Sequence, residues 1–518
     1  MLIHTDQFWS YLINEPPVVI AEAKRLLTFI RYNFDAKKEE YDIYWQKVFD
    51  WNEYTVIRFP TGMCKRLLDR LPIQEEIKKD TTRYIYTEED VQKAAEEVKK
   101  INPNFEIRDY QIKAALTALN NFNCIAQSST GSGKTSVISM VCKILKDDKI
   151  LITNGNNIIL QQIYERLLSF GITDIGWNPS EEPDYDKRIV LINTATSDSR
   201  LNSQDEKYIN FLKMVNTWCI DECQHAQGLT GFEPVFYMDE EKLKRIIGFS
   251  ATPFRRYDAP YDNDQDFRLI ALLGEPKFKY EMQDTIADNN IAQPYGYFIK
   301  YNNYIPNLPD KFKKDYFMQY RMGITYNKAR NTAGLAMLKY LSEHNVITLA
   351  CVNKIKNGQK IIEELTKQGI KCKMICGNQH GRIGSTIFEY KPNKRGTLKL
   401  EETDGTVEDL EKAFDEGYNV IVGTSVLQEG ADVQRFQAVV LFTGAKDYIG
   451  STQMIGRAVR KKKTGKNIAL VVDFNDYGGL PVLANHCDIR KAAMRKNGIK
   501  IIEKVQDFCK LIDSLNEP

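Results

Sequence analysis

The segment from Cys124 to Thr135, CIAQSSTGSGKT, carries a short apolar run into a loop of small residues and then into a helix-like stretch. A loop of this kind directs backbone N–H groups and a helix N-terminus at an anion, so the segment predicts a strand, a phosphate-binding loop and a helix in that order. Small polar residues between a strand and a helix also form ordinary turns, and the interpretation therefore depends on what accompanies the loop.

The residues of this loop have expected roles. Lys134 is expected to reach the β- and γ-phosphates of a nucleotide, and the Thr135 hydroxyl to hold Mg²⁺. The loop departs from the general pattern at Ser128, where a Gly usually stands. The other expected contacts to the phosphates come from Ser129, Thr130, Gly131, Ser132 and Gly133.

A second motif, DECQH, follows the apolar run Trp218–Ile220. A buried parallel strand would deliver its carboxylates to the C-terminal edge of the sheet. We expect Asp221 to hold the Mg²⁺ that bridges the phosphates, Glu222 to polarise the attacking water, and His225 to sense the γ-phosphate. Solvated acids at a strand end are the commoner fate of an Asp-Glu pair, so this motif also depends on its neighbours.

Three further blocks follow in order: GFSATP at 248–253, TSVLQEGAD at 424–432 and QMIGRAVR at 453–460. The first is an apolar strand that ends in hydroxyl residues, with Arg255 just beyond it. In the third, Arg457 and Arg460 lie about one helical turn apart, so both can face a transferring phosphoryl group. This arrangement predicts arginine-finger geometry.

Together, in this order, the blocks resemble the superfamily 2 nucleic-acid-dependent ATPases over residues 107–473, a superfamily in which the Ser128 variant is at home. The resemblance implies ATP and Mg²⁺ as cofactors. Arg108 and Gln111 are similar to the adenine-recognition segment of the family, and the Gln111 amide could pair with the adenine edge. An exposed helix residue is the alternative for Gln111. The resemblance also assigns nucleotide or catalytic roles to Gly430, Asp432, Gln453, Arg457 and Arg460.

Short β-branched runs alternate with helix-like stretches, as expected for an α/β fold of two tandem RecA-like lobes with a small α+β N-terminal accessory domain. ATP is expected between the lobes. Hydroxyls at strand ends and a basic residue are expected to contact nucleic acid at Thr194, Arg255, Thr424 and Ser425, although such hydroxyls also cap helices. The expected divisions are an accessory domain (1–104), a first lobe (105–259), a connection (260–335), a second lobe (336–480) and a helical tail (481–518).

Two regions outside the motifs leave alternatives open. The accessory domain, with a helix-like stretch ending at Arg31 and an expected helix cap at Thr87 and Asp90, matches loosely the DNA-contacting domain of UvsW-like helicases, and a structural brace is the alternative. Residues 385–403 predict a hairpin with a basic tip. This hairpin could split a duplex as a wedge, or it could be a surface insertion that covers a sheet edge.

The composition adds few constraints. A net charge of +2 does not indicate a dedicated nucleic-acid module, so the basic tetrad at 460–463 is either part of a basic track or a solvated face. No apolar stretch approaches membrane-spanning length, and we expect a cytoplasmic protein. The ten cysteines are scattered and are expected to be reduced. Cys372 and Cys376 have no second ligand pair nearby, which favours thiols over a zinc site.

The sequence therefore predicts an ATP- and Mg²⁺-dependent DNA helicase or translocase. The spelling SATPFR and the segment Leu273–Glu275 resemble XPB- and UvsW-type helicases. That resemblance implies branched DNA as the substrate, fork regression and Holliday junction branch migration as the activity, and recombination or replication proteins as partners. The alternatives are an RNA helicase, a duplex-tracking motor that does not separate strands, and a nucleic-acid-binding protein with an inactive ATPase site.

Overall fold

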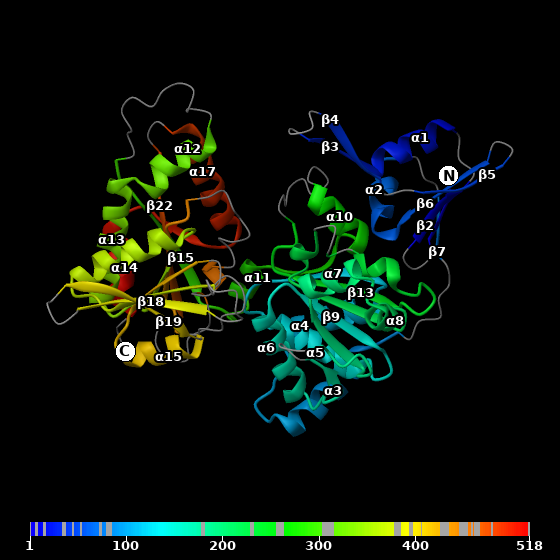
Figure 1. The fold of residues 1–518 in the computed structure, drawn as a ribbon, viewed down its shortest axis with the longest axis horizontal. Helices are drawn as coiled ribbons and strands as arrows, with labels where there is room; N and C mark the ends of the chain where they lie inside the picture. The colour runs from blue at the N-terminus through cyan, green and yellow to red at the C-terminus, as the bar shows by residue number, and fades with distance from the viewer. Residues whose placement is uncertain are drawn as a thin grey trace. The chain divides into compact units, whose positions relative to one another are not determined.

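The structure is a computed structural model of the 518-residue chain, shown in Figure 1. Two compact units divide the chain: 1–128 with 133–280, and 129–132 with 281–518. The structure describes residues 2–5, 9–13, 17–33, 38–43, 46–51, 54–71, 75–78, 85–177, 182–227, 231, 233–254, 264–302, 315–377, 385–392, 397–405, 407–424, 435–444, 454–456, 459, 467–477 and 480–515.

The first lobe is built on a seven-stranded parallel sheet with the order β10-β11-β9-β12-β13-β8-β14. Its strands are β8 (Asn123–Ser128), β9 (Ile150–Asn154), β10 (Ile175–Gly176), β11 (Ile189–Asn193), β12 (Thr217–Asp221), β13 (Arg245–Ser250) and β14 (Pro276–Tyr280). The helices are α3 (Glu88–Ile101), α4 (Asp109–Asn120), α5 (Lys134–Ile144), α6 (Asn157–Ser169), α7 (Thr194–Asn202), α8 (Glu206–Leu212) and α10 (Asp264–Leu273).

Both faces of the central strands β8, β9, β12 and β13 are buried, which explains why these strands are largely apolar without a polar side, whereas the edge strand β14 alternates. Along β12, Trp218 and Ile220 pack into one core while Cys219 between them packs into a second. The second core is completed by α3, α4, α5 and α6, and the first by α8 and α10. The carboxyl ends of β8, β12 and β13 therefore meet at one edge of a sheet that is covered on both sides.

The second lobe has a nine-stranded sheet with the order β19-β18-β17-β20-β16-β21-β22-β15-β23, parallel except for the β17-β18-β19 edge. Its strands are β15 (Gln293–Ile299), β16 (Thr348–Cys351), β17 (Cys372–Gly377), β18 (Ser385–Pro392), β19 (Leu398–Gly405), β20 (Val420–Gly423), β21 (Ala438–Leu441), β22 (Ile468–Phe474) and β23 (Lys500–Ile502). The helices are α11 (Met282–Ala287), α12 (Tyr316–Tyr320), the π-helical turn Arg321–Thr325, α13 (Lys328–Glu343), α14 (Ile355–Lys367), α15 (Val407–Asp415), α17 (Pro481–Lys496) and α18 (Val505–Leu515).

These two sheets confirm the predicted fold class of two tandem α/β lobes. The sheets of the structure do not follow the expected domain boundaries at every point. The segment 260–335, expected to be a connection, gives β14 to the first sheet and β15 to the second, and the tail expected to be helical contains β23. The segment 385–403 forms β18 and β19, which extend the sheet beyond β17, while residues 393–396 at its turn lie outside the described residues. Cys372 and Cys376 are both buried in β17, where they pack as core thiols.

The N-terminal residues form a five-stranded sheet of order β5-β6-β2-β1-β7 and a separate β3-β4 pair. The predicted helix ending at Arg31 is wrong in its end: α1 stops at Leu26, and Arg31 lies in β3, where β-branched and aromatic residues favour a strand. The elements are β1 (Leu2–Thr5), β2 (Trp9–Ile13), α1 (Pro17–Leu26), β3 (Thr28–Asn33), β4 (Lys38–Ile43), β5 (Gln46–Trp51), β6 (Tyr54–Pro60), α2 (Cys64–Leu68) and β7 (Glu75–Lys78).

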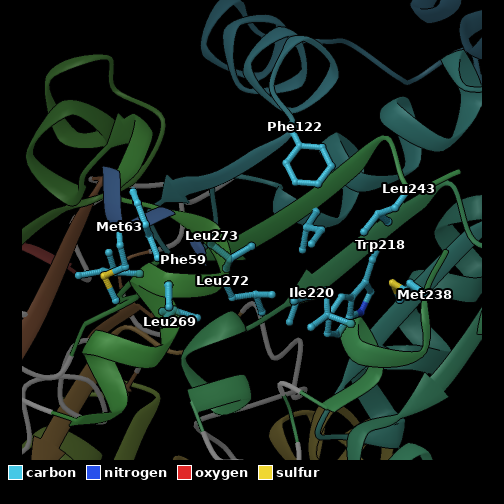
Figure 2. Packing of buried hydrophobic residues seen from close by; sticks show 14 of the residues in the cluster. Phe59, Met63, Phe122, Trp218, Ile220, Met238, Leu243, Leu269, Leu272 and Leu273 are labelled. Carbon is cyan, nitrogen blue, oxygen red and sulfur yellow. The ribbon is translucent and has the colours of Figure 1, made fainter. Parts of the chain in front are cut away.

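The N-terminal elements share an apolar core with the first lobe through α10. Figure 2 shows Phe59 and Met63 beside Leu269, Leu272 and Leu273, all in one cluster of buried residues. Such a shared core is what the bracing alternative requires, and a role of this region in DNA contact stays a prediction. The predicted cap is confirmed, because the Thr87 hydroxyl accepts from Asp90 N–H while the Asp90 carboxylate accepts from Thr87 N–H. Among the described residues, no helix combines the length and apolar character needed to cross a membrane.

Candidate nucleotide site

The phosphate-binding loop is held open by two glycines in left-handed conformation. β8 ends at Ser128 and α5 begins at Lys134, and both Gly131 and Gly133 have φ of +82°. A Cβ on Gly133 would lie 2.5 Å from Gln111 Nε2. Since Gly adopts this φ with the least strain, the two glycines of the loop follow from its backbone conformation.

Gln111 is buried beside this loop. Its side chain is 6% exposed, and its Oε1 accepts a hydrogen bond of 3.1 Å from the backbone N–H of Arg108. Arg108 donates from its guanidinium to the Tyr110 hydroxyl, and the Tyr110 ring stacks on Tyr280 with centroids 3.9 Å apart. The alternative of an exposed helix residue is therefore wrong for Gln111. Its role in adenine recognition, and that of Arg108, stay predictions.

The carboxylates of DECQH lie at the end of β12, close to Lys134. Asp221 is 5% exposed, and Asn154 Nδ2 at the end of the neighbouring β9 donates to its Oδ2 at 3.1 Å. Burial and the negative charge of Glu222 raise the pKa of Asp221 to about 7. Lys134 Nζ lies 3.5 Å from Glu222 Oε1, and one ammonium therefore faces two acids.

Glu222 has a backbone φ of +47°, which is uncommon for a residue with a side chain. A conformation of this type persists only where the surrounding structure enforces it, and such positions are concentrated at functional sites. The Glu222 side chain is held by another residue of the same motif, because Gln224 Nε2 donates to Glu222 Oε2 at 2.8 Å.

Gln224 also connects Glu222 to the SAT block. The Ser250 hydroxyl at the end of β13 donates to Gln224 Oε1 at 2.5 Å and accepts from the backbone N–H of Thr252 at 3.0 Å. Ser250 and Gln224 are both buried. The result is a chain of contacts from Lys134 through Glu222 and Gln224 to Ser250. We name these four residues the lysine–serine relay.

Sequence reasoning missed the roles of Asn154 and Gln224 in this site. Gln224 was visible inside DECQH, but nothing in the sequence shows which way its amide points. Asn154 comes from a different strand, and it becomes a candidate only once β9 is known to lie beside β12. The polar residue at the end of a buried strand, ILITN, was the available signal.

The other predicted residues fall in three groups. His225 is exposed in the short 3₁₀ turn after Glu222, and Thr194 is the first residue of α7, whose N-cap is Asn193. Thr424 follows β20 and is half-buried. The structure therefore does not bring Thr194 or Thr424 into the lysine–serine relay. The remaining predicted positions lie outside the described residues: Arg255, Ser425, Gly430, Asp432, Gln453, Arg457 and Arg460.

The residues present fit a divalent cation and a phosphate chain. Two adjacent carboxylates, one of them buried with a raised pKa, gain from a cation that neutralises their repulsion, and oxygen ligands suit Mg²⁺. The open loop at Gly131, where an added Cβ would meet nothing within 4 Å, leaves the backbone accessible to an anion.

Comparisons with known proteins agree with this geometry. The family described as Type III restriction enzyme, res subunit, matches residues 104–255, and the family described as Helicase conserved C-terminal domain matches residues 335–462. Together these ranges cover more than half of the 518-residue chain and contain both lobes' motif blocks. The chain belongs to the superfamily 2 helicases. Members of this superfamily are ATP-hydrolysing proteins, and the two family matches support the predicted enzyme class.

Two relatives place this superfamily 2 chain more closely. It is 24% identical over 389 residues to a protein of Sulfolobus islandicus filamentous virus that bears the name helicase 22, an alignment covering 69% of this chain and 62% of the viral protein. It is also 24% identical over 386 residues to the DNA 3'-5' translocase XPB2 of Sulfurisphaera tokodaii, covering 70% of this chain and 80% of that one. The chain thus spans less than two thirds of the viral relative.

A solved structure shares the fold of this helicase. Dbp5 of S. cerevisiae, bound to RNA and ADP BeF3, covers 83% of this chain and 97% of its own, with a TM-score of 0.52 and 15% sequence identity. Identity this low shows the fold alone. The likeness supports two tandem RecA-like lobes, and it does not choose between DNA and RNA.

Proposed function

We propose that the chain is an ATP- and Mg²⁺-dependent DNA helicase or translocase that acts on branched DNA, in fork regression and Holliday junction branch migration. The lysine–serine relay is the single observation that carries the ATPase part, because it joins three motif blocks of the sequence into one contiguous site. The DNA part rests on the relative named as a DNA translocase and on the SATPFR spelling.

In this proposal the phosphates of ATP bind the loop 129–133 and the N-terminus of α5, with Lys134 against the β- and γ-phosphates. Thr135 and Asp221 would hold Mg²⁺, which supplies positive charge to the phosphates when bound. Glu222 orients the attacking water and accepts its proton, since its carboxylate is fixed by Gln224 within reach of Lys134. His225, Arg457 and Arg460 complete the proposed set.

In this proposal, Ser250 couples the nucleotide site to the segment that follows β13. When the γ-phosphate binds, Lys134 is drawn from Glu222 to the phosphate, and the Glu222 carboxylate keeps its hydrogen bond from Gln224. The Gln224 amide is in turn oriented by Ser250, which lies at the end of β13. The nucleotide state is thereby transmitted to the segment that follows β13, where Arg255 is proposed to contact DNA.

The experiment is ATP hydrolysis by the purified chain with single-stranded DNA, duplex DNA, a four-way junction or RNA, each matched in phosphate concentration. The proposal expects the strongest stimulation from the junction. Stimulation by RNA alone would indicate that the chain is an RNA helicase. Equal stimulation by duplex and junction would favour a motor that tracks duplex without separating strands.

A matched variant separates binding from chemistry in the same assay. Glu222→Gln keeps an acceptor and a similar shape but removes the proposed base, so it is expected to bind ATP and DNA while hydrolysis falls by about 100-fold or more. Glu240→Gln, at an exposed acid of the same lobe, is the control and is expected to retain turnover. Normal hydrolysis by Glu222→Gln would contradict its proposed role.

A further inference from the structure

A cavity lies in the second lobe, where the backbone N–H of Val352 in its lining donates to Gly423, the residue before the TSVLQEGAD block. It has a volume of about 160 Å³ and opens where β16 and β21, which are hydrogen-bonded neighbours, come to their carboxyl ends. Val352 and Asn353 follow β16, and Phe442 follows β21. In open α/β sheets, ligands bind in crevices just beyond the carboxyl ends of the strands.

The floor of this cavity is apolar and closely fitted. Val352 and Phe442 are almost fully buried, and Leu335 of α13 and Ile361 of α14 complete the floor. The Phe442 ring reaches its place because α13 has a glycine opposite it: a Cβ on Gly334 would lie 2.5 Å from the ring. A flat apolar surface of this kind suits the face of a planar ligand.

One wall is an aromatic ring fixed at its polar end. The Tyr320 hydroxyl donates to the backbone carbonyl of Thr443 and accepts from Asn353 Nδ2, both at 2.8 Å. Tyr320 leads directly into the π-helical turn Arg321–Thr325, a distortion that is frequent at functional sites. Thr325 lines the cavity, is 7% exposed, and its hydroxyl has no hydrogen-bond partner in the described part of the chain.

The rim is formed by neutral amides and one pair of opposite charges. Asn331 of α13, Asn353, and Asn357 of α14 line it, together with Lys360 and Glu364 at successive turns of α14. A phosphate would meet one cation opposed by a carboxylate, and a hydrocarbon would leave the amides without partners, at a cost in free energy. The lining instead favours a neutral, planar ligand with donors and acceptors on its edge.

The surface next to the cavity suits a nucleic-acid strand. Phe317, one helical turn before Tyr320, and Tyr326, directly after Thr325, are exposed to 78% and 59%. The Arg321 guanidinium lies over the Tyr326 ring at 5.8 Å from its centroid. Exposed aromatic rings with cations beside them are the surface on which unpaired bases stack.

We propose that this cavity receives one unpaired nucleobase of the bound strand, with its face against Tyr320 and the apolar floor and its edge against the amides. Amide side chains carry a donor and an acceptor side by side, which is the pattern that base edges present. The inference rests on the proposed function, since it requires a nucleic-acid substrate. It adds a base-binding site to lobe contacts that otherwise reach only the backbone of the strand.

The test compares intact single-stranded oligonucleotides with oligonucleotides in which an abasic position is walked along the strand. The readout is the DNA concentration that half-saturates ATP hydrolysis. In the wild-type chain one abasic position is expected to raise this concentration roughly tenfold, as the loss of a stacked base does elsewhere. Leu335→Trp fills the cavity and is expected to raise the half-saturating concentration of intact DNA by a similar factor. In this variant the abasic position should raise that concentration no further.

Two variants control the test. Ala336→Trp introduces the same side chain at an exposed position of α13 and should behave as wild type. Asn357→Leu removes one rim amide at nearly constant size and should weaken the binding of intact DNA several-fold. Thermal melting verifies that each variant is folded. If the abasic penalty is as large in Leu335→Trp as in wild type, the base site is overturned while the helicase proposal stands. If neither DNA nor RNA stimulates hydrolysis by the wild type, the proposed function itself fails.

Discussion

The two lobes each contain a buried cluster of acids and bases, and the two clusters have opposite electrostatics. In the first lobe, Asp221 lies beside Glu222, and burial with this like charge raises the pKa of Asp221 to about 7. In the second lobe, burial opposes ionisation of Asp476, but the charges of Arg330 and Arg490 outweigh it and lower the pKa of Asp476. A buried aspartate therefore stays ionised in the second-lobe cluster, whereas a buried aspartate in the first-lobe cluster resists ionisation.

The partners explain the difference. Arg490 donates to Asp473 from Nε and to Asp476 from Nη2, both at 2.7 Å, and Arg330 Nε reaches Asp476 at 3.0 Å. All four side chains are at most 3% exposed. This second-lobe cluster ties α13 and α17 to the end of β22, and its two arginines balance the charge of its two aspartates. The first-lobe acids Asp221 and Glu222 face one lysine, Lys134, whose single charge offsets only one of the two carboxylates.

The largest expected effect is the loss of protein stability when the second-lobe cluster is disrupted. Arg490→Met leaves Asp473 and Asp476 buried with less positive charge, which is expected to cost about 3–5 kcal/mol in the free energy of unfolding. Chemical denaturation measures it. Arg495→Met, at an exposed position of the same helix, is the control and should change little. A loss equal to that of the control would mean that the cluster does not hold the lobe together.

The pH dependence of this variant sharpens the comparison. Because the pKa of Asp476 is lowered on folding, its ionised form adds stability above its ordinary value of 3.8 and this contribution is lost as the pH falls through the folded value. The difference in the free energy of unfolding between wild type and Arg490→Met should therefore be largest near pH 7 and should become smaller below about pH 4. A difference that is constant with pH would contradict the charge argument.

The next largest effect is on catalysis in the first lobe. Lys134→Ala removes the cation proposed to stabilise the transferring phosphoryl group, so the turnover rate is expected to fall at least about 100-fold. Circular dichroism verifies that the variant is folded, because Lys134 also lies 3.5 Å from the Glu222 carboxylate and its loss leaves two acids side by side. Lys146→Ala, after α5 and exposed, should keep its turnover. Retained turnover in Lys134→Ala would overturn the nucleotide site.

A smaller effect on the turnover rate is expected at Ser250, the neutral hydroxyl of the lysine–serine relay. Ser250→Ala removes the donor that orients Gln224, and through it Glu222, so turnover should fall about tenfold while ATP binding is kept. Ser250 is here a positioning residue, and its signature is a loss in the turnover rate without a matching loss in ATP affinity. Ser197→Ala, which removes a buried hydroxyl bonded to Tyr208, serves as the control for stability.

The smallest effect has the opposite sign. Without nucleotide and in EDTA, Asp221→Asn is expected to raise the free energy of unfolding by about 1 kcal/mol, because it removes a charge that the folded chain disfavours, while hydrolysis is lost. The raised pKa of Asp221 means that the gain should grow from about pH 4 to pH 7. Asp148→Asn is the contrast: this buried acid pairs with Lys244 at 2.8 Å and Arg245 at 3.1 Å, so its loss should destabilise.

The sequence predicted the first-lobe site more completely than any other part of the chain. CIAQSSTGSGKT specified a strand, a loop and a helix because the glycines, lysine and threonine each have a local physical requirement that few other residues meet. DECQH and GFSATP were placed at strand ends by their apolar runs, and β12 and β13 end as expected. The helix cap at Thr87 and Asp90 was equally local and equally predictable.

Predictions that required neighbours from distant parts of the chain were weaker. Arg31 was assigned to a helix because a basic, apolar segment precedes it, but pairing with β4 decides that it is in a strand. Residues 264–280 were read as a connection, although the sheet of the first lobe takes β14 beside β8. Strand order depends on contacts between segments far apart in sequence, and no local pattern contains it.

By itself, therefore, the sequence determined which residue types the site contains, which of them carry charge, and that two α/β lobes follow each other, and it predicted which residues bind phosphate. Only the tertiary structure decided the connections among these residues. It brought Asn154 to Asp221 across β9 and β12, aimed Gln224 between Glu222 and Ser250, and closed Arg330, Asp473, Asp476 and Arg490 into one cluster. The physical reason is that side-chain identity is local, whereas burial, amide orientation and charge pairing are set by which strands and helices become neighbours.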